Sequence, residues 1–513
     1  MARSRRDFLK QAGITSAVLT VPTWLTGCAT TASVAASATA PVPENPFYEW
    51  FGIDNGMLNR VMAALTSRGA DHADLYFQYS RSNSISMEDG IVSKASSSID
   101  EGVGLRVVVG DQTGYAFTED LSEPAMLAAA KTAAAIANGG GFDAPVAFTQ
   151  QPKAHDFYTL GVPFADVGIH DKLPVIEKLE AKAKALDPAV SKVRIWWSDS
   201  EERVLVVNHK GHVHTDVRPQ SRLWCSITAE KDGEVQSGGA NLAGRRELGW
   251  YDDGMLDKLA KQAIDRTMIL FDARRPPAGE LPVVLAAGAS GILLHEAVGH
   301  GMEADFNRKG TSIYSEMLGK QVAPDFVTII DSGLHPGERG ALNFDDEGNP
   351  AAETKLVENG ILKSYLHDTI SAKHYGVEPT GSGRRQSFRH APMPRMRCTY
   401  MDDGPHTKDE IIESVKLGIV AETFTNGQVQ IGAGDFTFYV KNGWLIEDGK
   451  VTAPIRDVNI IGNGPEALKN TTMAANDAAL DTGGWTCGKN GQSVPVSQGL
   501  PTVLVSSLTV GGA

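Results

Sequence analysis

The segment of this 513-residue chain best suited to chemistry contains His295, Glu296 and His300. It reads His-Glu-x-x-x-His, one residue longer than the His-Glu-x-x-His pattern of zinc-binding helices. Imidazole is the commonest metal-binding side chain, and a carboxylate beside it can act as a general base. The segment therefore predicts a metal site, although histidines at this spacing are more often ordinary helix residues.

The extra residue in the motif has a geometric consequence. On a regular α-helix, positions i and i+5 are turned by about 500°, which leaves the two side chains about 140° apart. Both imidazoles reach one ion only if the helix widens or stops between them, and a π turn brings them back into line. Gly299 lowers the steric cost of such a distortion, because it lacks a Cβ. We therefore predict a helix that breaks or widens at Val298–Gly299.

A third ligand must come from another part of the chain, since catalytic zinc usually has three protein ligands and one open position. Cys487 is the best candidate, because flanking glycines let its backbone approach a metal and Lys489 favours the thiolate. The alternative for Cys487 is a small buried hydrophobic residue. Glu303 and Asp305 follow the second histidine and are candidate hydrogen-bond partners for the metal-binding imidazoles.

Such a His/His/Cys site predicts hydrolytic chemistry with Zn²⁺ as the cofactor. Zinc would activate a water molecule at the open position. Glu296, beside a ligand, would take the proton of that water and pass it to a leaving amine.

Three other groups of residues have less specific patterns. His209, His212 and His214 predict either a second metal site or a solvated polar turn. Cys225 and Cys398 are expected to remain separate thiols, because nothing in the sequence brings them together. A cluster of basic residues predicts either a site for a peptide carboxylate or a structural loop paired with acidic groups; it comprises Arg384, Arg385, Arg389, His390, Arg395 and Arg397.

The N-terminus is typical of a targeting segment. Paired arginines, Arg5 and Arg6, precede an apolar stretch that ends in Leu25-Thr26-Gly27-Cys28. Residues 1–27 thus resemble a twin-arginine export signal followed by a lipobox, with Cys28 as the lipidated residue. Residues 28–46 are rich in Ala, Thr, Ser and Pro and predict a flexible tether. We expect an exported protein held on the periplasmic side of a bacterial membrane by its lipid anchor only.

The remaining chain predicts an α+β fold. Residues 47–275 alternate helical stripes with strand-like segments and turns, indicating α/β sub-units with antiparallel sheets at about 47–140 and 170–270. Residues 280–513 become Gly-punctuated β-structure with few helices, which predicts a β-rich catalytic domain. The segment Ala273–Gly279 between them is typical of a linker.

Composition excludes several classes of protein. The net charge of −14 argues against a nucleic-acid partner, because such proteins need basic surface to displace counterions. The sequence contains no run of 18 or more apolar residues, so it predicts no membrane-spanning helix. Four cysteines are too few for a disulfide scaffold.

The motif around the histidines resembles the signature of the TldD/PmbA family of metallopeptidases, in its catalytic TldD-type members. Further segments resemble family blocks in the same order: 102–109, 345–348, 383–385, 395–396, 445–450, 461–465, 487–492 and 510–512. The resemblance covers about residues 50–513. It departs from the family at Cys398, where an Asn is usual.

The resemblance implies a zinc-dependent peptidase that acts on unfolded or short peptides within a chamber formed by two subunits. It makes His295, His300 and Cys487 the zinc ligands and Glu296 the general base. The partner would be a second copy of the chain or a PmbA-type relative. The alternatives are a dedicated hydrolase acting on one peptide, an amide or a cell-wall peptide, and a non-catalytic partner subunit.

Overall fold

The computed structural model describes residues 45–135, 147–430 and 432–512. Contacts divide the chain into residues 1–44 and 45–513, and all described residues belong to the second unit. The predicted signal at 1–27, Cys28 and the tether up to residue 44 lie outside the described residues. No described helix has both the length and the apolar character needed to cross a membrane.

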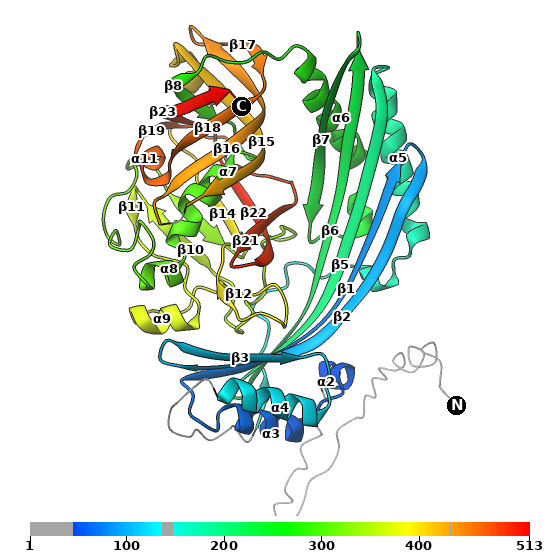
Figure 1. Cartoon of the computed structure of the whole chain (residues 1–513), viewed down its shortest axis with the longest axis vertical. Helices are drawn as coiled ribbons and strands as arrows, with labels where there is room; N and C mark the ends of the chain where they lie inside the picture. Colours follow the sequence, from blue (N-terminus) through cyan, green and yellow to red (C-terminus); the bar gives the residue numbers. More distant parts are fainter. Residues whose placement is uncertain (1–44, 136–146, 431, 513) are drawn as a thin grey trace, which may run out of the picture. The chain divides into compact units, whose positions relative to one another are not determined.

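One sheet contains all the described strands before residue 245. Its order is β3-β2-β1-β5-β6-β4, with β7 beside β6 (Figure 1). Neighbours are antiparallel except β4 and β6. Because β1 pairs with both β2 and β5, the two predicted sub-units share this sheet. The bounds are β1 His72–Glu88, β2 Ile91–Val109, β3 Gln112–Thr118, β4 Thr149–Gln150, β5 Val190–Asn208, β6 His212–Lys231 and β7 Glu234–Gly244.

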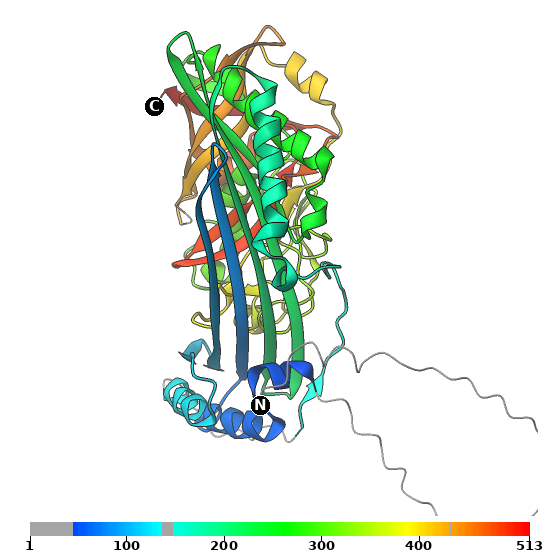
Figure 2. The ribbon, with the colours of Figure 1, turned by 90° about the vertical axis from the view of Figure 1, so that its right-hand side faces the viewer.

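Helices cover the apolar side of this sheet in two groups. α2 (Pro46–Phe51), α3 (Asn55–Leu65) and α4 (Glu123–Ala134) pack on one end, where Leu58 and Val61 meet Leu75. α5 (Ile169–Leu186) and α6 (Asp253–Met268) pack on the other end (Figure 2). Both groups follow the predicted helical stripes, since burying one stripe of an amphipathic helix stabilises it. Short 3₁₀ turns flank these helices, at η1 Phe164–Asp166, η2 Leu248–Trp250 and η3 Ile269–Phe271.

The opposite face of the same strands carries small polar side chains. Ser84 on β1 lies beside Ser96 on β2 and Ser198 on β5, whereas its chain neighbour Ile85 is buried against the helices. This alternation follows from the two-residue period of a strand. The serine face is turned toward the hairpin near Cys487, since both line one cavity.

The C-terminal half contains a closed ring of strands. β15 pairs with β8 and with β16, and the order β15-β8-β23-β18-β16 completes the ring, with β17 and β19 attached. A large apolar core lies between this ring and the neighbouring segments. The bounds are β8 Gly279–Leu285, β15 Leu417–Val429, β16 Asp435–Glu447, β17 Lys450–Ile455, β18 Val458–Asn463, β19 Thr471–Ala474 and β23 Val503–Gly512.

A third sheet supports the segment that carries Cys487. Its order is β11-β10-β9-β14-β22-β20, and β21 pairs with β22. These strands are β9 Ile329–Ser332, β10 Glu353–Glu358, β11 Ile361–Leu362, β14 Cys398–Met401, β20 Ala479–Leu480, β21 Trp485–Lys489 and β22 Gln492–Leu500. A separate pair joins β12 Gly383–Arg384 to β13 Met393–Pro394. This half also contains the helices α8 Ala304–Arg308, α9 Thr369–Tyr375, α10 Lys408–Glu413 and α11 Gly464–Lys469. The predicted α+β fold with antiparallel sheets is confirmed.

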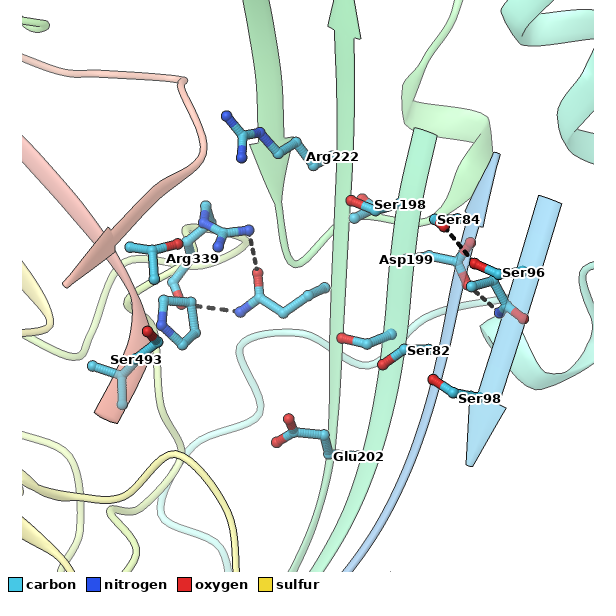
Figure 3. Close-up of a pocket in the computed structure, with 17 residues that line it drawn as sticks. Ser82, Ser84, Ser96, Ser98, Ser198, Asp199, Glu202, Arg222, Arg339 and Ser493 are labelled. Carbon is cyan, nitrogen blue, oxygen red and sulfur yellow. Dashed lines mark hydrogen bonds between the residues drawn. The ribbon is translucent and has the colours of Figure 1, made fainter. Parts of the chain in front are cut away.

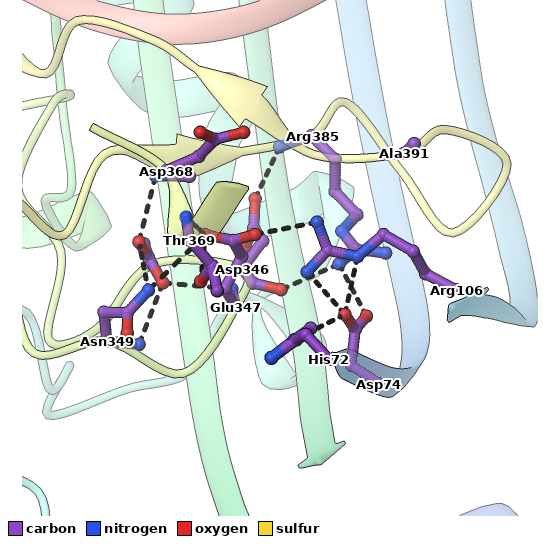
Figure 4. A network of polar contacts seen from close by, with 12 residues as sticks. His72, Asp74, Arg106, Asp346, Glu347, Asn349, Asp368, Thr369, Arg385 and Ala391 are labelled. Atoms are coloured by element: carbon purple, nitrogen blue, oxygen red, sulfur yellow. Dashed lines mark hydrogen bonds and ion pairs between the residues drawn. The ribbon is translucent and has the colours of Figure 1, made fainter. Parts of the chain in front are cut away.

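The sheet formed by β1–β7 is called the long sheet below. A buried ion-pair network joins it to the C-terminal half (Figure 4). Arg106 on β2 lies 2.5 Å from Asp74 on β1 and 2.7 Å from Glu347, and Asp74 also lies 3.0 Å from Arg385. All four side chains are inaccessible to solvent. Burial raises the pKa of Asp74, but Arg106 and Arg385 outweigh burial and hold that pKa well below its usual value.

Replacing Asp74 with Asn should destabilise the protein by about 3–5 kcal/mol, because Arg106 and Arg385 would lose a buried counter-charge. Thermal unfolding measures the change. The matched control is Glu358→Gln, which removes the carboxylate of an exposed pair with Lys355 and should leave the melting temperature unchanged. Equal melting temperatures for Asp74→Asn and wild type would show that the network does not hold the two parts together.

Candidate metal centre

The helix that carries His295 and His300 widens where the sequence analysis predicted. α7 (Gly291–Leu294) continues into a single π turn, η4 (His295–Gly299), and then into a 3₁₀ turn, η5 (His300–Met302). The two imidazole rings lie 5.1 Å apart between centroids and are nearly perpendicular. The π turn thus places two side chains five residues apart on the same side of the helix.

Gly299 has a role different from the predicted one. Its φ is −60°, an ordinary helical value, so the backbone there needs no special freedom. A Cβ at this position would instead lie 2.1 Å from Met396 Sδ. Gly464 on α11 is similar, because a Cβ there would lie 2.0 Å from the carbonyl oxygen of Ala297. Both glycines allow neighbouring segments to pack directly against the π turn.

Cys487 on β21 completes a group of possible metal ligands. One ligand atom each from His295, His300 and Cys487 lies within 4.8 Å of the others, and Cys487 Sγ is 3.5 Å from His300 Nε2. Arg395 holds this strand, because its Nη2 donates to the carbonyl oxygen of Cys487 at 2.6 Å. From the sequence Arg395 is expected only as a member of a basic cluster, because the strand that it contacts is distant along the chain.

The surroundings of His295 are those of a metal ligand. The residue is 1% exposed, and neither ring nitrogen has a hydrogen-bond partner among the described residues. A buried polar atom without a partner is unfavourable, whereas imidazole nitrogen and thiolate sulfur are favoured ligands of zinc. The three residues therefore fit a zinc ion.

Glu303 orients the second histidine. Its carboxylate accepts a hydrogen bond from His300 Nδ1 at 2.9 Å, which directs Nε2 toward Cys487. Burial raises the pKa of Glu303, but Lys489 and then His300 lower it to about 2. Glu303 is thus an anion that favours proton retention at His300 Nδ1.

Two predicted contacts differ in the structure. Asp305 does not contact either imidazole but accepts a hydrogen bond from Lys489 Nζ at 2.7 Å. Lys489 also lies 3.0 Å from Glu303, so its charge is neutralised by two carboxylates rather than directed at the thiolate. Lys489 therefore supports Glu303, which in turn supports His300.

The two imidazoles favour the thiolate form of Cys487. Burial raises the pKa of this thiol, but His300 and His295 outweigh burial and bring the pKa well below its usual value. The thiolate is the form that binds metals.

Glu296 is the more accessible side chain of the motif. It is 22% exposed, whereas His300 is 3% exposed, and Glu296 Oε2 lies 3.8 Å from His300 Nε2. This carboxylate therefore lies beside the ligand group while still facing solvent-accessible space.

The other predicted histidine and arginine clusters have structural contacts. His209 Nδ1 accepts a hydrogen bond from the backbone of Ala73, and His212 and His214 lie 6.5 Å apart between ring centroids. Within the described ranges these histidines do not form a metal-ligand group. The arginines of the cluster bind protein groups: Arg385 binds Asp74, Arg389 binds Asp100 and Glu119, Arg397 binds Asp331, and Arg384 and Arg395 bind backbone carbonyls.

The other described cysteines are separate, as predicted. Cys225 on β6 and Cys398 on β14 are buried free thiols. Burial raises the pKa of both, so both are neutral packing residues at neutral pH.

Three family profiles match successive parts of the chain. They are PmbA/TldA metallopeptidase domain 1 at residues 73–137, the central domain at 162–271 and the C-terminal domain at 278–512. The chain is 39% identical over 463 residues to "Metalloprotease TldD homolog" of Haemophilus influenzae, covering 89% of this chain and 96% of that protein. It is 28% identical over 451 residues to "Zinc metalloprotease TldD homolog" of Saccharolobus solfataricus, covering 86% and 97%.

Solved structures share the fold. TldE from Thermococcus kodakarensis matches with a TM-score of 0.67 at 18% identity, covering 89% of this chain and 99% of that one. A Thermotoga maritima protein matches with a TM-score of 0.70 at 23% identity, covering 86% and 96%.

Replacing Cys487 with Ala should weaken Zn²⁺ binding at least tenfold, because a thiolate ligand is lost. Zinc content after purification without chelators and a competition titration measure the change. Cys398→Ala is the matched control, since it removes another buried thiol and should leave zinc binding unchanged. Unchanged zinc affinity in the Cys487 variant would remove this residue from the ligand set.

Proposed function

Since the chain belongs to the TldD/PmbA family of metallopeptidases and is therefore a hydrolase, we propose that it is a zinc-dependent peptidase with Glu296 as general base. The observation that carries this proposal is the convergence of His295, His300 and Cys487 beside the Glu296 carboxylate. The name of the Saccharolobus solfataricus relative supports zinc as the metal.

In this proposal, different residues bind the metal ion and transfer the proton. His295, His300 and Cys487 would hold the ion, with Glu303 fixing the orientation of His300. A bound zinc ion supplies Lewis-acid chemistry, which polarises a carbonyl and lowers the pKa of water. Glu296 accepts the proton of the attacking water at its carboxylate and donates it to the nitrogen of the leaving amine.

Because the three ligand residues are buried, they favour substrates with a small cross-section. His295, His300 and Cys487 are each at most 2% exposed, so the surface of a folded protein would not reach them. An extended single chain has the smallest cross-section that still presents a peptide carbonyl. We therefore propose unfolded or short peptides as substrates.

Replacing Glu296 with Gln should lower cleavage of an unstructured peptide about 10²–10⁴-fold, because the amide cannot accept the proton. Zinc content should remain that of wild type, since Glu296 is not a ligand in this proposal. Product-resolved mass spectrometry of the digest and metal analysis measure the two effects.

Glu316→Gln is the control, because it changes an exposed glutamate of the same half and should leave cleavage unchanged. Full activity of Glu296→Gln would refute the role of this residue. A wild-type protein that binds zinc but cleaves no peptide would identify a non-catalytic subunit or a hydrolase dedicated to another substrate.

We also propose export and lipid anchoring, supported by Arg5, Arg6 and the segment ending at Cys28. A dimer with a second copy or with a PmbA-type relative is proposed on the family resemblance.

Changing both Arg5 and Arg6 to Lys should prevent export, because lysine lacks the guanidinium of a twin-arginine signal. Cell fractionation with detection of the chain in the membrane fraction measures this effect. Arg3→Lys is the control, since it keeps the paired arginines. Normal export of the double variant would contradict the proposed signal.

A further inference from the structure

A cavity of about 380 Å³ separates the serine face of the long sheet from the hairpin β21–β22 (Figure 3). Serines of β1, β2 and β5 line one wall, including Ser82, Ser84, Ser96, Ser98, Ser198 and Ser200. Thr486, Ser493 and Pro495 line the hairpin side. Short hydroxyl side chains leave room for another chain and offer it hydrogen bonds.

Arg222 enters this cavity from β6. Its Nε donates to Asn241 Oδ1 at 3.0 Å, and its guanidinium lies 5.0 Å from the centre of the Trp224 ring. Within the described part of the chain, neither of its terminal nitrogens has a hydrogen bond or an ion pair. Four of the five N–H donors of the Arg222 guanidinium, two on each terminal nitrogen, therefore remain available.

Arg339 reaches the cavity from the segment between β9 and β10. Its Nη1 donates to Gln220 Oε1 at 3.2 Å and its Nε to the carbonyl oxygen of Trp485 at 3.3 Å. Burial, and after it the charge of Arg222, lowers the pKa of Arg339 to about 10. The Arg339 guanidinium is therefore still a cation at neutral pH. Arg222 and Arg339 thus place two positive charges along one cavity.

Among the described residues, neither of the two carboxylates that line the cavity is paired with Arg222 or Arg339. Asp199 is held by Lys172 at 2.6 Å and by Trp197 Nε1 at 2.6 Å. Glu202 is half-buried; burial raises the pKa of its carboxyl, against the lowering effect of Arg218 and Arg245. By contrast, Arg106, Arg218, Arg385 and Arg397 all have a carboxylate partner.

The arginine pair is adjacent to the strand of the candidate metal centre. Thr486 faces the cavity, and the next residue, Cys487, points to the opposite side of β21 toward the histidines. Arg222 also touches the segment before β21, because a Cβ on Gly484 would lie 2.6 Å from Arg222 Nε. The same arginine lines a neighbouring cavity of about 530 Å³ with Phe424 and Trp485.

We propose that Arg222 and Arg339 form a carboxylate-binding subsite for the substrate, so that preferred substrates are peptides that carry an anionic group. A carboxylate would supply the anion that both guanidiniums lack, and arginine binds this planar group in a bidentate manner. The anion is either an acidic side chain or the C-terminal carboxylate. This inference rests on the proposed peptidase function and adds the substrate class.

Three unstructured peptides of otherwise identical sequence test the proposal. The first contains Glu and has a free C-terminus, the second has Gln in place of Glu, and the third has an amidated C-terminus. Fluorescence anisotropy measures their affinities for the zinc-loaded Glu296→Gln protein, in which cleavage does not interfere. At least one neutralised peptide should bind about tenfold more weakly than the first, and the weaker one identifies the source of the carboxylate. Equal affinity of all three peptides would overturn the proposal without any further variant.

Variants of the arginines test the location of the subsite. Arg222→Gln and Arg339→Gln, each added to Glu296→Gln, should remove most of the tenfold preference. The matched control is Arg81→Gln, because Arg81 is also partly buried but binds the carbonyl oxygen of Ala165. A preference that persists without both arginines would place the anion site elsewhere, and thermal unfolding shows that each variant is folded.

The two proposals fail in different ways. Arginine-dependent binding of acidic peptides without cleavage by the wild type would support the subsite and contradict the peptidase function. Cleavage of all three peptides by the wild type, together with equal affinities of the three for the Glu296→Gln protein, would support the peptidase function and contradict the subsite.

Discussion

The buried contact of Arg106 with Asp74 and Glu347 is the interaction on which the arrangement of the two halves depends. Charges removed from water must be compensated by partners in fixed positions. Asp74 and Arg106 lie on neighbouring strands, whereas Glu347 and Arg385 come from the C-terminal half. The network therefore has its full compensation only when the long sheet lies against that half, and this arrangement also forms the cavity beside β21.

Arginine has three distinct uses in this protein. Arg106 and Arg397 are buried with carboxylates and join segments through ion pairs. Arg395 donates to the backbone of Cys487 and fixes the strand that carries the thiol. Arg222 and Arg339 face a cavity without a carboxylate partner among the described residues, so their charge is available to a ligand. The same side chain is thus structural or ligand-directed according to its partners.

The candidate metal centre depends on a local distortion that its surroundings stabilise. A π turn is unusual in a helix and is often found at functional sites. Here Gly299 and Gly464 allow Met396 and the backbone of α11 to pack against the turn. Glu303 and Lys489 then fix the second imidazole from the other side. These contacts hold the π turn and the second imidazole from several sides.

The sequence by itself determined the local features. If His295 and His300 were to bind one ion, their spacing required the helix to widen or stop between them, because a regular helix separates positions i and i+5 by about 140°. Helical stripes and strand alternation determined the α+β fold, since both periods follow from backbone geometry. Even so, the reason for Gly299 was not visible, because the neighbour that excludes a Cβ, Met396, is far away in the chain.

Only the tertiary structure decided which distant residues meet. Cys487 joins the histidines, Lys489 binds Glu303 and Asp305, and the two predicted N-terminal sub-units share one sheet. It also divided the arginines, pairing those near residue 390 with protein groups and leaving Arg222 and Arg339 facing the cavity. The physical reason is that charge compensation and metal-ligand geometry act over a few ångströms in space, whereas sequence patterns report only on neighbours along the chain.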